Sequence, residues 1–162
     1  MPSSRENDTV TIRSATVADA VRIAELSGVL GYPITTETAA ARLEHLLGCS
    51  EHLVLVAEIT GVVGWVHASE QCLLELGLRC EIMGLVVAAN QRAKRIGRQL
   101  VGRAERWAAE RGAEQLSVRS NITRSESHPF YERLGYLRTK TQHVYRKQIS
   151  RNAEATITCP TT

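Results

Sequence analysis

The stretch of residues 85–100, LVVAANQRAKRIGRQL, is the feature that most constrains the fold of this chain. An apolar run of strand length passes through a short basic turn into a segment whose apolar residues recur at helical spacing. A helix that begins directly after a strand leaves its first backbone amides without intrahelical partners, so these amides point together at one spot. Gly97 leaves room there for the backbone of a ligand, and the basic side chains add positive charge. The turn is therefore predicted to bind phosphate. The basic residues are Arg92, Lys94, Arg95 and Arg98.

The composition indicates one globular domain. The chain has 162 residues, of which 43% are apolar and 23% charged, enough for a core of normal size without a second domain. Its longest apolar stretches, residues 53–57 and 85–89, have the length of strands and fall far short of the roughly 20 residues that span a membrane. The N-terminus lacks the apolar core of a signal peptide, which predicts a cytoplasmic protein without membrane association.

Cysteine spacing and net charge exclude further classes. The four cysteines stand at irregular spacings without a CxxC pair, which favours reduced thiols over a disulfide framework or a zinc site. A net charge of +3 does not indicate a nucleic-acid partner. The alternative interpretation of the basic residues in 92–111 is a patch that binds nucleic acid. Acidic residues interrupt this basic segment, however, and aromatic residues do not alternate with its basic residues.

Strand and helix patterns alternate along the chain. A capping box at Thr16 and Asp19 begins the first helix, which Gly28 ends, and Thr35 or Thr36 caps the second. The pair Thr60-Gly61 predicts a hairpin between the second and third strands, so the sheet begins antiparallel. Residues 72–77 are ambiguous between loop and strand. The predicted strands cover residues 9–15, 52–59, 62–68, 79–87 and 115–119, and the helices follow residues 16, 36 and 95.

The strand, helix and strand around residues 79–119 imply a parallel pair inside an otherwise antiparallel sheet. Such a pair has to splay at one end to admit a long, thin ligand between its strands. Residues 125–134 then have the length of a short helix that ends at Gly135, with Phe130 and Leu134 one turn apart for the core. Residues 144–149 are predicted to form the last edge strand. Residues 1–8 are predicted to be a flexible N-terminus, and residues 150–162 a disordered tail.

In this order, the strand EIMGLVV, the turn RAKRIG and the later HPFYERLGY resemble the GNAT superfamily of acyl-CoA-dependent N-acetyltransferases. The signature turn of that family is Gln/Arg-x-x-Gly-x-Gly/Ala. Arg92 holds its first position and Gly97 its last, but Arg95 stands where the middle glycine is usual. Arg95 can still offer its backbone amide if its dihedral angles are helical. Within the superfamily, Arg124 and His128 fit the Arg-x-x-x-His-x-Phe-Tyr pattern of aminoalkylphosphonate and other small-amine acetyltransferases.

The resemblance covers residues 9–149 and implies one N-acetyltransferase domain of α+β class, an α/β sandwich. Its sheet would be mixed and mostly antiparallel, with one splayed parallel strand pair and about four flanking helices. The implied reaction is transfer of an acetyl group from acetyl-CoA to a primary amine of a small molecule or peptide, by direct attack in a ternary complex. The resemblance also allows a homodimer. A non-catalytic acyl-CoA sensor that kept the phosphate turn remains the alternative from another class.

Two residues are candidates for proton transfer. In the resembling family a glutamate 11 residues before the first motif position acts as general base, and Glu81 holds that place. Its alternative reading is an ordinary glutamate on a half-buried strand. Tyr131 resembles the general acid that protonates the departing thiolate, which would otherwise leave poorly at a thiol pKa near 8.5. The alternative is a tyrosine ring that only fills the core.

The resemblance assigns acetyl-CoA binding mainly to main-chain groups. Residues of the strand end would lie along the acetyl and pantetheine arm, and the turn would bind the diphosphate. Arg124 replaces the usual asparagine seven residues before the tyrosine, and Asn121 is the candidate substitute. His128 is read as a structural residue rather than a ligand for substrate or metal. The implied cofactor-binding residues are Leu85, Val86, Val87, Arg92, Ala93, Lys94, Arg95, Ile96, Gly97, Arg98 and Asn121.

Overall fold

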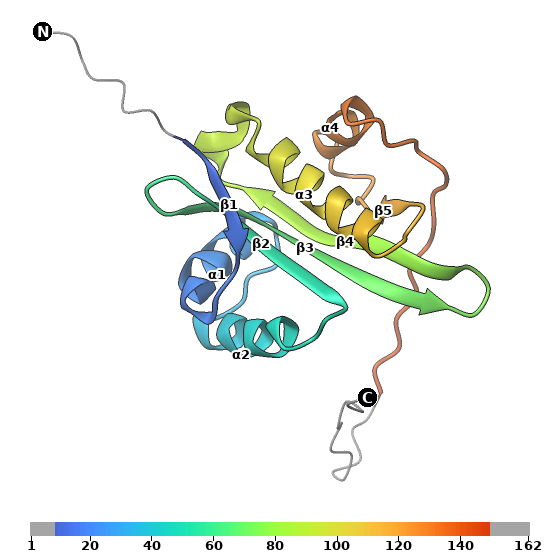
Figure 1. Cartoon of the computed structure of the whole chain (residues 1–162), viewed down its shortest axis with the longest axis horizontal. Helices are drawn as coiled ribbons and strands as arrows, with labels where there is room; N and C mark the ends of the chain where they lie inside the picture. Colours follow the sequence, from blue (N-terminus) through green and yellow to red (C-terminus); the bar gives the residue numbers. More distant parts are fainter. Residues whose placement is uncertain (1–8, 150–162) are drawn as a thin grey trace, which may run out of the picture.

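Five strands form one mixed sheet in the computed structural model, which describes residues 9–149 of the chain (Figure 1). Neighbouring strands run antiparallel except for the last pair, which is parallel. The predicted α+β architecture, with its parallel pair at the C-terminal side of an antiparallel sheet, is confirmed. In spatial order the strands are β1 (Thr11–Ser14), β2 (His52–Glu58), β3 (Val62–Leu73), β4 (Gly77–Val87) and β5 (Leu116–Val118).

Helices cover both faces of the sheet. Two lie on one face, and the long helix that follows the basic turn lies on the other, with a short helix beside it (Figure 1). The helices are α1 (Ala20–Val29), α2 (Thr36–Leu47), α3 (Ile96–Glu110) and α4 (Ser127–Arg133). No helix within residues 9–149 combines the length and apolar character that crossing a bilayer requires.

Alternation along β2 explains the two cores. Successive side chains of a strand point to opposite faces, so Val54 and Val56 pack against α1 and α2, whereas Leu55 and Ala57 pack against α3. The apolar stripe predicted for α3 is confirmed, because its aliphatic members are buried. In α1, Ile23 and Leu26 are buried, whereas Val21 is exposed.

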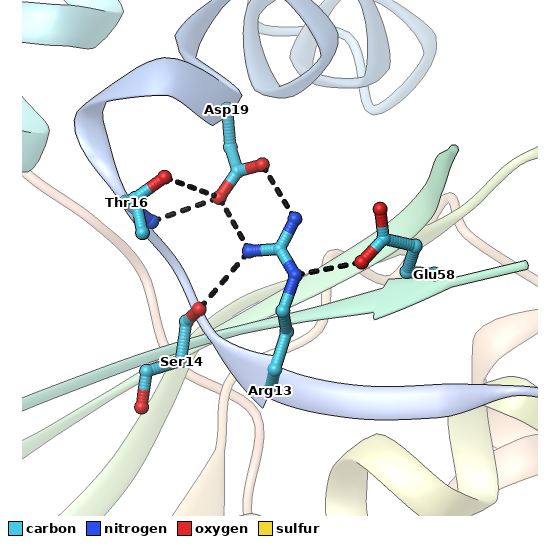
Figure 2. Close-up of polar contacts among 5 residues, drawn as sticks. All are labelled: Arg13, Ser14, Thr16, Asp19 and Glu58. Atoms are coloured by element: carbon cyan, nitrogen blue, oxygen red, sulfur yellow. Dashed lines mark hydrogen bonds and ion pairs between the residues drawn. The ribbon is translucent and has the colours of Figure 1, made fainter. Parts of the chain in front are cut away.

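An ion-pair network fixes the start of α1 to the sheet edge (Figure 2). From β1, Arg13 donates two hydrogen bonds of 2.8 Å to the carboxylate of buried Asp19 and one of 2.7 Å to Glu58 on β2. The same carboxylate accepts from the backbone of Thr16 at 2.8 Å, as the capping box predicted. The hydrogen bonds from Arg13 hold the pKa of Asp19 below its usual value. Asp19 therefore contributes stability that is complete above about pH 4 and is lost as the pH falls through its folded-state pKa.

We expect Arg13→Met to lower the free energy of unfolding at pH 7 by about 2 kcal/mol. The substitution leaves the buried carboxylate of Asp19 without its partner, and the partial exposure of Arg13 to solvent limits the loss. Chemical denaturation of both proteins measures the difference. The deficit should shrink as the pH falls, because the carboxylate of Asp19 without its partner takes up a proton in the folded variant at a higher pH than the ion-paired carboxylate of the parent does. Equal stability at pH 7 would show that the network does not hold α1 in place.

Several predicted boundaries differ from those observed. Helix α1 continues past Gly28 to Val29, because the amide of Leu30 still bonds the carbonyl of Leu26. Residues 72–77, left ambiguous, complete the hairpin in which β3 reaches Leu73 and β4 begins at Gly77. The helix predicted over residues 125–134 is the shorter α4.

One predicted element does not form. Residues 144–149 were expected to make the last edge strand, but they pair with no strand of the described chain and are exposed. β-Propensity alone does not give a strand, because a ladder requires an edge to pair with. Cys49, Cys72 and Cys80 are free thiols. The predictions for residues 1–8, residues 150–162 and Cys159 lie outside the described residues.

Candidate active site

The parallel pair separates in its middle. The β4–β5 ladder joins Cys80–Ile82 to Leu116–Val118 and stops there, whereas β4 continues to Val87 and keeps its antiparallel partner β3. A register shift in the β3–β4 ladder between His67 and Ala68 coincides with the point of separation. The predicted splay is thus confirmed, and it leaves the second half of β4 with a free side.

Alternation directs two amides of β4 into this opening. The amide of Ala88 bonds the carbonyl of Val63 in β3 at 2.8 Å. In an antiparallel ladder every second residue bonds the same neighbour. The amides of Leu85 and Val87 consequently face away from β3, toward the side where β5 has diverged.

A large cleft of about 820 Å³ extends from the splayed strand across the start of α3 to α4. Its charged lining is strongly unbalanced, because Glu126 is the only acidic residue among the described residues that line it, against five arginines. Guanidinium groups bind phosphate oxygens bidentately, so this lining suits a ligand with several negative charges. The arginines are Arg92, Arg95, Arg98, Arg124 and Arg133.

The cleft brings together most of the residues that the sequence singled out for cofactor binding. Seven of them line it: Leu85, Val86, Val87, Arg92, Arg95, Gly97 and Arg98. Ala93 and Lys94 belong to the 3₁₀ turn before α3, and Lys94 does not line the cleft. The side chain of Ile96 is fully buried in the core, and Asn121 lines a smaller neighbouring cavity.

Arg95, at the start of α3, adopts a left-handed conformation with φ of +60° and ψ of +16°. Right-handed helical dihedral angles were the condition under which the sequence allowed Arg95 to offer its amide, but the turn has the geometry that glycine adopts without strain. The first amides of α3 follow directly, and no side chain caps them. They remain available to an anion at the positive end of the helix.

Gly97 serves the packing of two helices. A Cβ atom at this position would lie 3.1 Å from the ring of Phe130 in α4, and no described atom on the open side of the cleft comes as close. We expected the missing side chain to make room for a ligand, but the geometry shows that it first makes room for this ring. The close approach places α4 beside the start of α3, and so forms one wall of the cleft.

We expect Arg95→Val to lower the free energy of unfolding by about 1–2 kcal/mol relative to Arg95→Gly, because a β-branched residue is strained in the left-handed region. Chemical denaturation of the two variants measures this difference. The same two substitutions at Arg98, inside α3, form the matched control. There the order should reverse, because glycine is the weaker helix former. A valine variant at position 95 as stable as the glycine variant would contradict the strained turn.

A second cavity of about 120 Å³ lies between the diverging strands and shares several residues with the large cleft. Within residues 9–149, its lining includes Arg119 and Arg124 but no carboxylate. Arg124 donates a hydrogen bond of 2.7 Å to the carbonyl of Leu30 and stacks over the ring of Tyr32, 5.6 Å from its centroid. Arg124 thereby connects the segment before α4 to the end of α1.

Tyr131 lines both spaces and stands where they meet. It comes from the middle of α4, and its ring packs edge-on against Phe130 and Tyr136. Burial raises the pKa of its hydroxyl to about 12. The hydroxyl therefore keeps its proton throughout the neutral range and can act as a donor.

Glu81 lies just outside the second cavity. Its carboxylate is largely buried on β4 and forms a two-pronged ion pair with Arg119, with distances of 2.8 Å from Nε to Oε1 and 2.9 Å from Nη2 to Oε2. Glu81 lines neither cavity. Its partner Arg119 lines the smaller one, and 75% of the Arg119 side chain is exposed. Movement of this exposed arginine would uncover the carboxylate.

Sequence reasoning missed the role of Arg119 and the link made by Arg124. Arg119 follows β5 directly, and a polar residue at the end of a strand is a signal that the sequence does contain. Its pairing with Glu81, however, depends on the register between β4 and β5. Asn121 uses its side-chain oxygen within its own turn, accepting from the amide and hydroxyl of Thr123. His128 contacts the carbonyl of Asn121 at 3.1 Å, which agrees with its structural reading.

Comparisons with known proteins place this geometry in a family. Residues 22–136 match the model of the acetyltransferase (GNAT) family. A segment of 56 residues, 35% of this chain, is 45% identical to the aminoalkylphosphonate N-acetyltransferase of Salmonella typhimurium, and it spans about a third (36%) of that relative's length.

Solved structures share the fold over nearly their full length. A transcriptional regulator from Bacillus halodurans matches with a TM-score of 0.73 at 25% identity, covering 86% of this chain and 99% of that one. An aminoglycoside 6'-N-acetyltransferase from Acinetobacter baumannii matches with a TM-score of 0.77 at 18% identity, covering 88% and 100%. An aminoglycoside N-acetyltransferase in complex with CoA reaches 0.80 at 18% identity, covering 90% and 99%. With a family model matched over most of its length, this chain belongs to the acetyltransferase (GNAT) family.

Proposed function

We propose that this protein transfers the acetyl group of acetyl-CoA to the primary amine of a small molecule, by direct attack in a ternary complex. The observation that carries the proposal is the opening between β4 and β5, which joins an arginine-lined cleft to a second cavity. Two substrates entering from opposite ends could meet there. Holding two reactants in contact can itself supply much of the acceleration of a bimolecular reaction.

The large cleft supports the acetyl-CoA site. The free amides at the start of α3 and the arginines that line the cleft suit the diphosphate, while Leu85, Val86 and Val87 suit the acetyl and pantetheine arm. Bound acetyl-CoA would supply an activated thioester. The outward-facing amides of Leu85 and Val87 are placed to donate hydrogen bonds to its carbonyl oxygen, where negative charge develops during acyl transfer.

Tyr131 and Glu81 are assigned the proton transfers. Tyr131 retains its proton at neutral pH and lies in both spaces, so its hydroxyl can donate to the departing sulfur. Glu81 would take the proton of the acceptor ammonium, directly or through a water molecule, once Arg119 moves from its carboxylate. The ammonium of the acceptor can replace the positive charge that Arg119 provides.

The acceptor that fits best is a small amine that also carries an anionic group. Arg119 and Arg124 line the second cavity, and the absence of a lining carboxylate makes it unfavourable for a polycation such as an aminoglycoside or a polyamine. The partial likeness to an aminoalkylphosphonate N-acetyltransferase agrees with this charge pattern. In such an acceptor the anion would lie at the arginines and the ammonium toward Glu81.

A second candidate function is an acyl-CoA-binding sensor without turnover. It is favoured by the ion pair with Arg119, since both oxygens of the Glu81 carboxylate already accept hydrogen bonds and neither is free to contact an amine. Thermal stabilisation by CoA without release of thiol in the presence of any amine would support the sensor over the enzyme.

Thiol release from acetyl-CoA tests the proposal with three amines of different charge: 2-aminoethylphosphonate, propylamine and kanamycin. We expect thiol only when an amine is present, and the largest kcat/KM for the phosphonate. A preference for kanamycin would overturn the assigned acceptor class but not the reaction. No thiol with any of these amines, nor with a wider panel of polyamines and lysine peptides, would overturn the reaction itself.

A further inference from the structure

Arg119 connects the second cavity to the carboxylate that the proposed reaction uses as a base. It lines the cavity, and its guanidinium holds Glu81 through both of the contacts described above. The strand register explains this pairing. Glu81 stands opposite Ser117 in the parallel ladder, and alternation returns the side chain of the residue two positions later to the same face. One cation therefore binds the base and also faces the space that an acceptor would enter.

The two members of this ion pair differ in their freedom to move. Glu81 lies inside β4, and its side chain is only 11% exposed. Arg119 lies just beyond the last ladder pair, which joins Ile82 to Val118, and most of its side chain is in solvent. An exposed arginine can change its rotamer at little cost because water solvates the charged head, whereas a largely buried carboxylate stays where the strand holds it. Arg119 is therefore the partner that can leave.

The other arginine of the second cavity is held in place by uncharged groups. Arg124 donates to the carbonyl of Leu30 and stacks over the ring of Tyr32. Neither of these partners neutralises its charge, and no carboxylate among the described residues lines the cavity. Arg124 therefore attracts the anionic group of an acceptor into the space that Arg119 also lines.

The balance of charges decides which acceptors can exchange partners with the ion pair. An amine that also carries an anionic group brings an anion for the two arginines and an ammonium for Glu81, so each charge has an opposite partner. A plain amine brings only the ammonium. Its contact with Glu81 would leave Arg119 and Arg124 in one cavity without an anion, which like-charge repulsion makes unfavourable. The ion pair therefore resists a plain amine and yields to an anionic one.

We propose that Arg119 is a specificity-determining residue, which covers Glu81 until the anionic group of an acceptor takes over its guanidinium; this inference rests on the proposed acetyl transfer. The uncovered carboxylate then takes one proton from the ammonium. The N–C bond forms before the C–S bond breaks, and the sulfur receives the proton of Tyr131, which the second proton of the amine nitrogen replaces. The anionic group of the acceptor thereby raises kcat as well as lowering KM.

Steady-state kinetics of Arg119→Ala with 2-aminoethylphosphonate and propylamine test the proposal, because both acceptors carry a primary amine and only one carries an anion. In the parent protein we expect kcat to be about five- to tenfold larger with the phosphonate, the range that loss of a charged contact at a partly exposed site gives. In Arg119→Ala the carboxylate is open to both amines. The kcat for propylamine should therefore rise to that of the phosphonate, while the KM of the phosphonate rises at least about tenfold.

Two further variants support this comparison. Arg119→Lys keeps the charge but loses the planar fork that holds both carboxylate oxygens, so it should show the same changes to a smaller degree. Arg111→Gln is the matched control, because Arg111 also pairs with a strand glutamate, Glu70, but lines neither cavity. Its preference between the two amines should equal that of the parent. Circular dichroism checks that each variant keeps the fold.

Other roles of Arg119 give different results. If it only binds the anion, Arg119→Ala raises the KM of the phosphonate and leaves kcat for propylamine unchanged. If it only positions Glu81, the substitution lowers kcat with both amines. Either result overturns the proposal, and so does a gain with propylamine that persists when Glu81→Gln is combined with Arg119→Ala. Thiol release by the parent protein separates these outcomes from failure of the reaction. If neither the parent nor Arg119→Ala releases thiol with any amine, the proposed function itself is overturned, and this inference with it.

Discussion

Glu81→Gln is expected to lower kcat for acetyl transfer by about 10²–10⁴-fold, the range that a general base contributes. The substitution keeps the shape of the side chain but removes its capacity to take a proton from the acceptor ammonium. CoA affinity should change little, because Glu81 does not line the large cleft. Steady-state kinetics with 2-aminoethylphosphonate, together with calorimetry of CoA binding, measure both quantities.

The pH dependence adds a second check on Glu81. The deficit of Glu81→Gln should narrow as the pH rises toward the pKa of the acceptor amine, about 10 for an alkylammonium, because solvent then removes the proton instead. Glu70→Gln is the matched control. Glu70 also lies on a strand and in an arginine ion pair, 2.7 Å from Arg111, but it lines neither cavity. If the two variants lose activity equally, Glu81 has no role as a base.

Tyr131→Phe is expected to reduce kcat by about 10–100-fold and to leave the Kd of CoA within about twofold, because only the hydroxyl that donates to the departing sulfur is lost. With a pKa of about 12, Tyr131 should not cause a fall in kcat of the parent protein below pH 10. Tyr136→Phe is the control, since its ring packs against Tyr131 at 5.7 Å but lines neither cavity. Full activity of Tyr131→Phe would remove this residue from the proposed mechanism.

Local signals in the sequence, together with the family resemblance, located the part of the large cleft's lining that comes from the end of β4 and the turn into α3. The strand, basic turn and helix are adjacent in the chain, so their geometry follows from backbone hydrogen bonding over a few residues. This is why seven of the predicted residues line one cleft. Local sequence patterns could not predict two details of this cleft. The left-handed conformation of Arg95 comes from the turn as a whole, and the ring that Gly97 accommodates belongs to Phe130, which is remote in sequence.

The second cavity could not be located in the same way. Arg119 and Glu81 are 38 residues apart, and the register of two parallel strands decides that they meet. Arg124 and Leu30 are 94 residues apart, so their hydrogen bond depends on how α1 and α4 sit on opposite sides of the opening. Neither contact has a periodic or compositional signal.

The sequence by itself determined the order of strands and helices as far as α4, the splayed parallel pair and the basic turn before α3, because apolar periodicity and helix-start chemistry act between neighbouring residues. Only the tertiary structure decided which charges line the second cavity, that Arg119 holds Glu81, and that residues 144–149 pair with no strand of the described sheet. Those features depend on contacts between distant segments, and strand register and helix packing set such contacts only once the whole chain has folded.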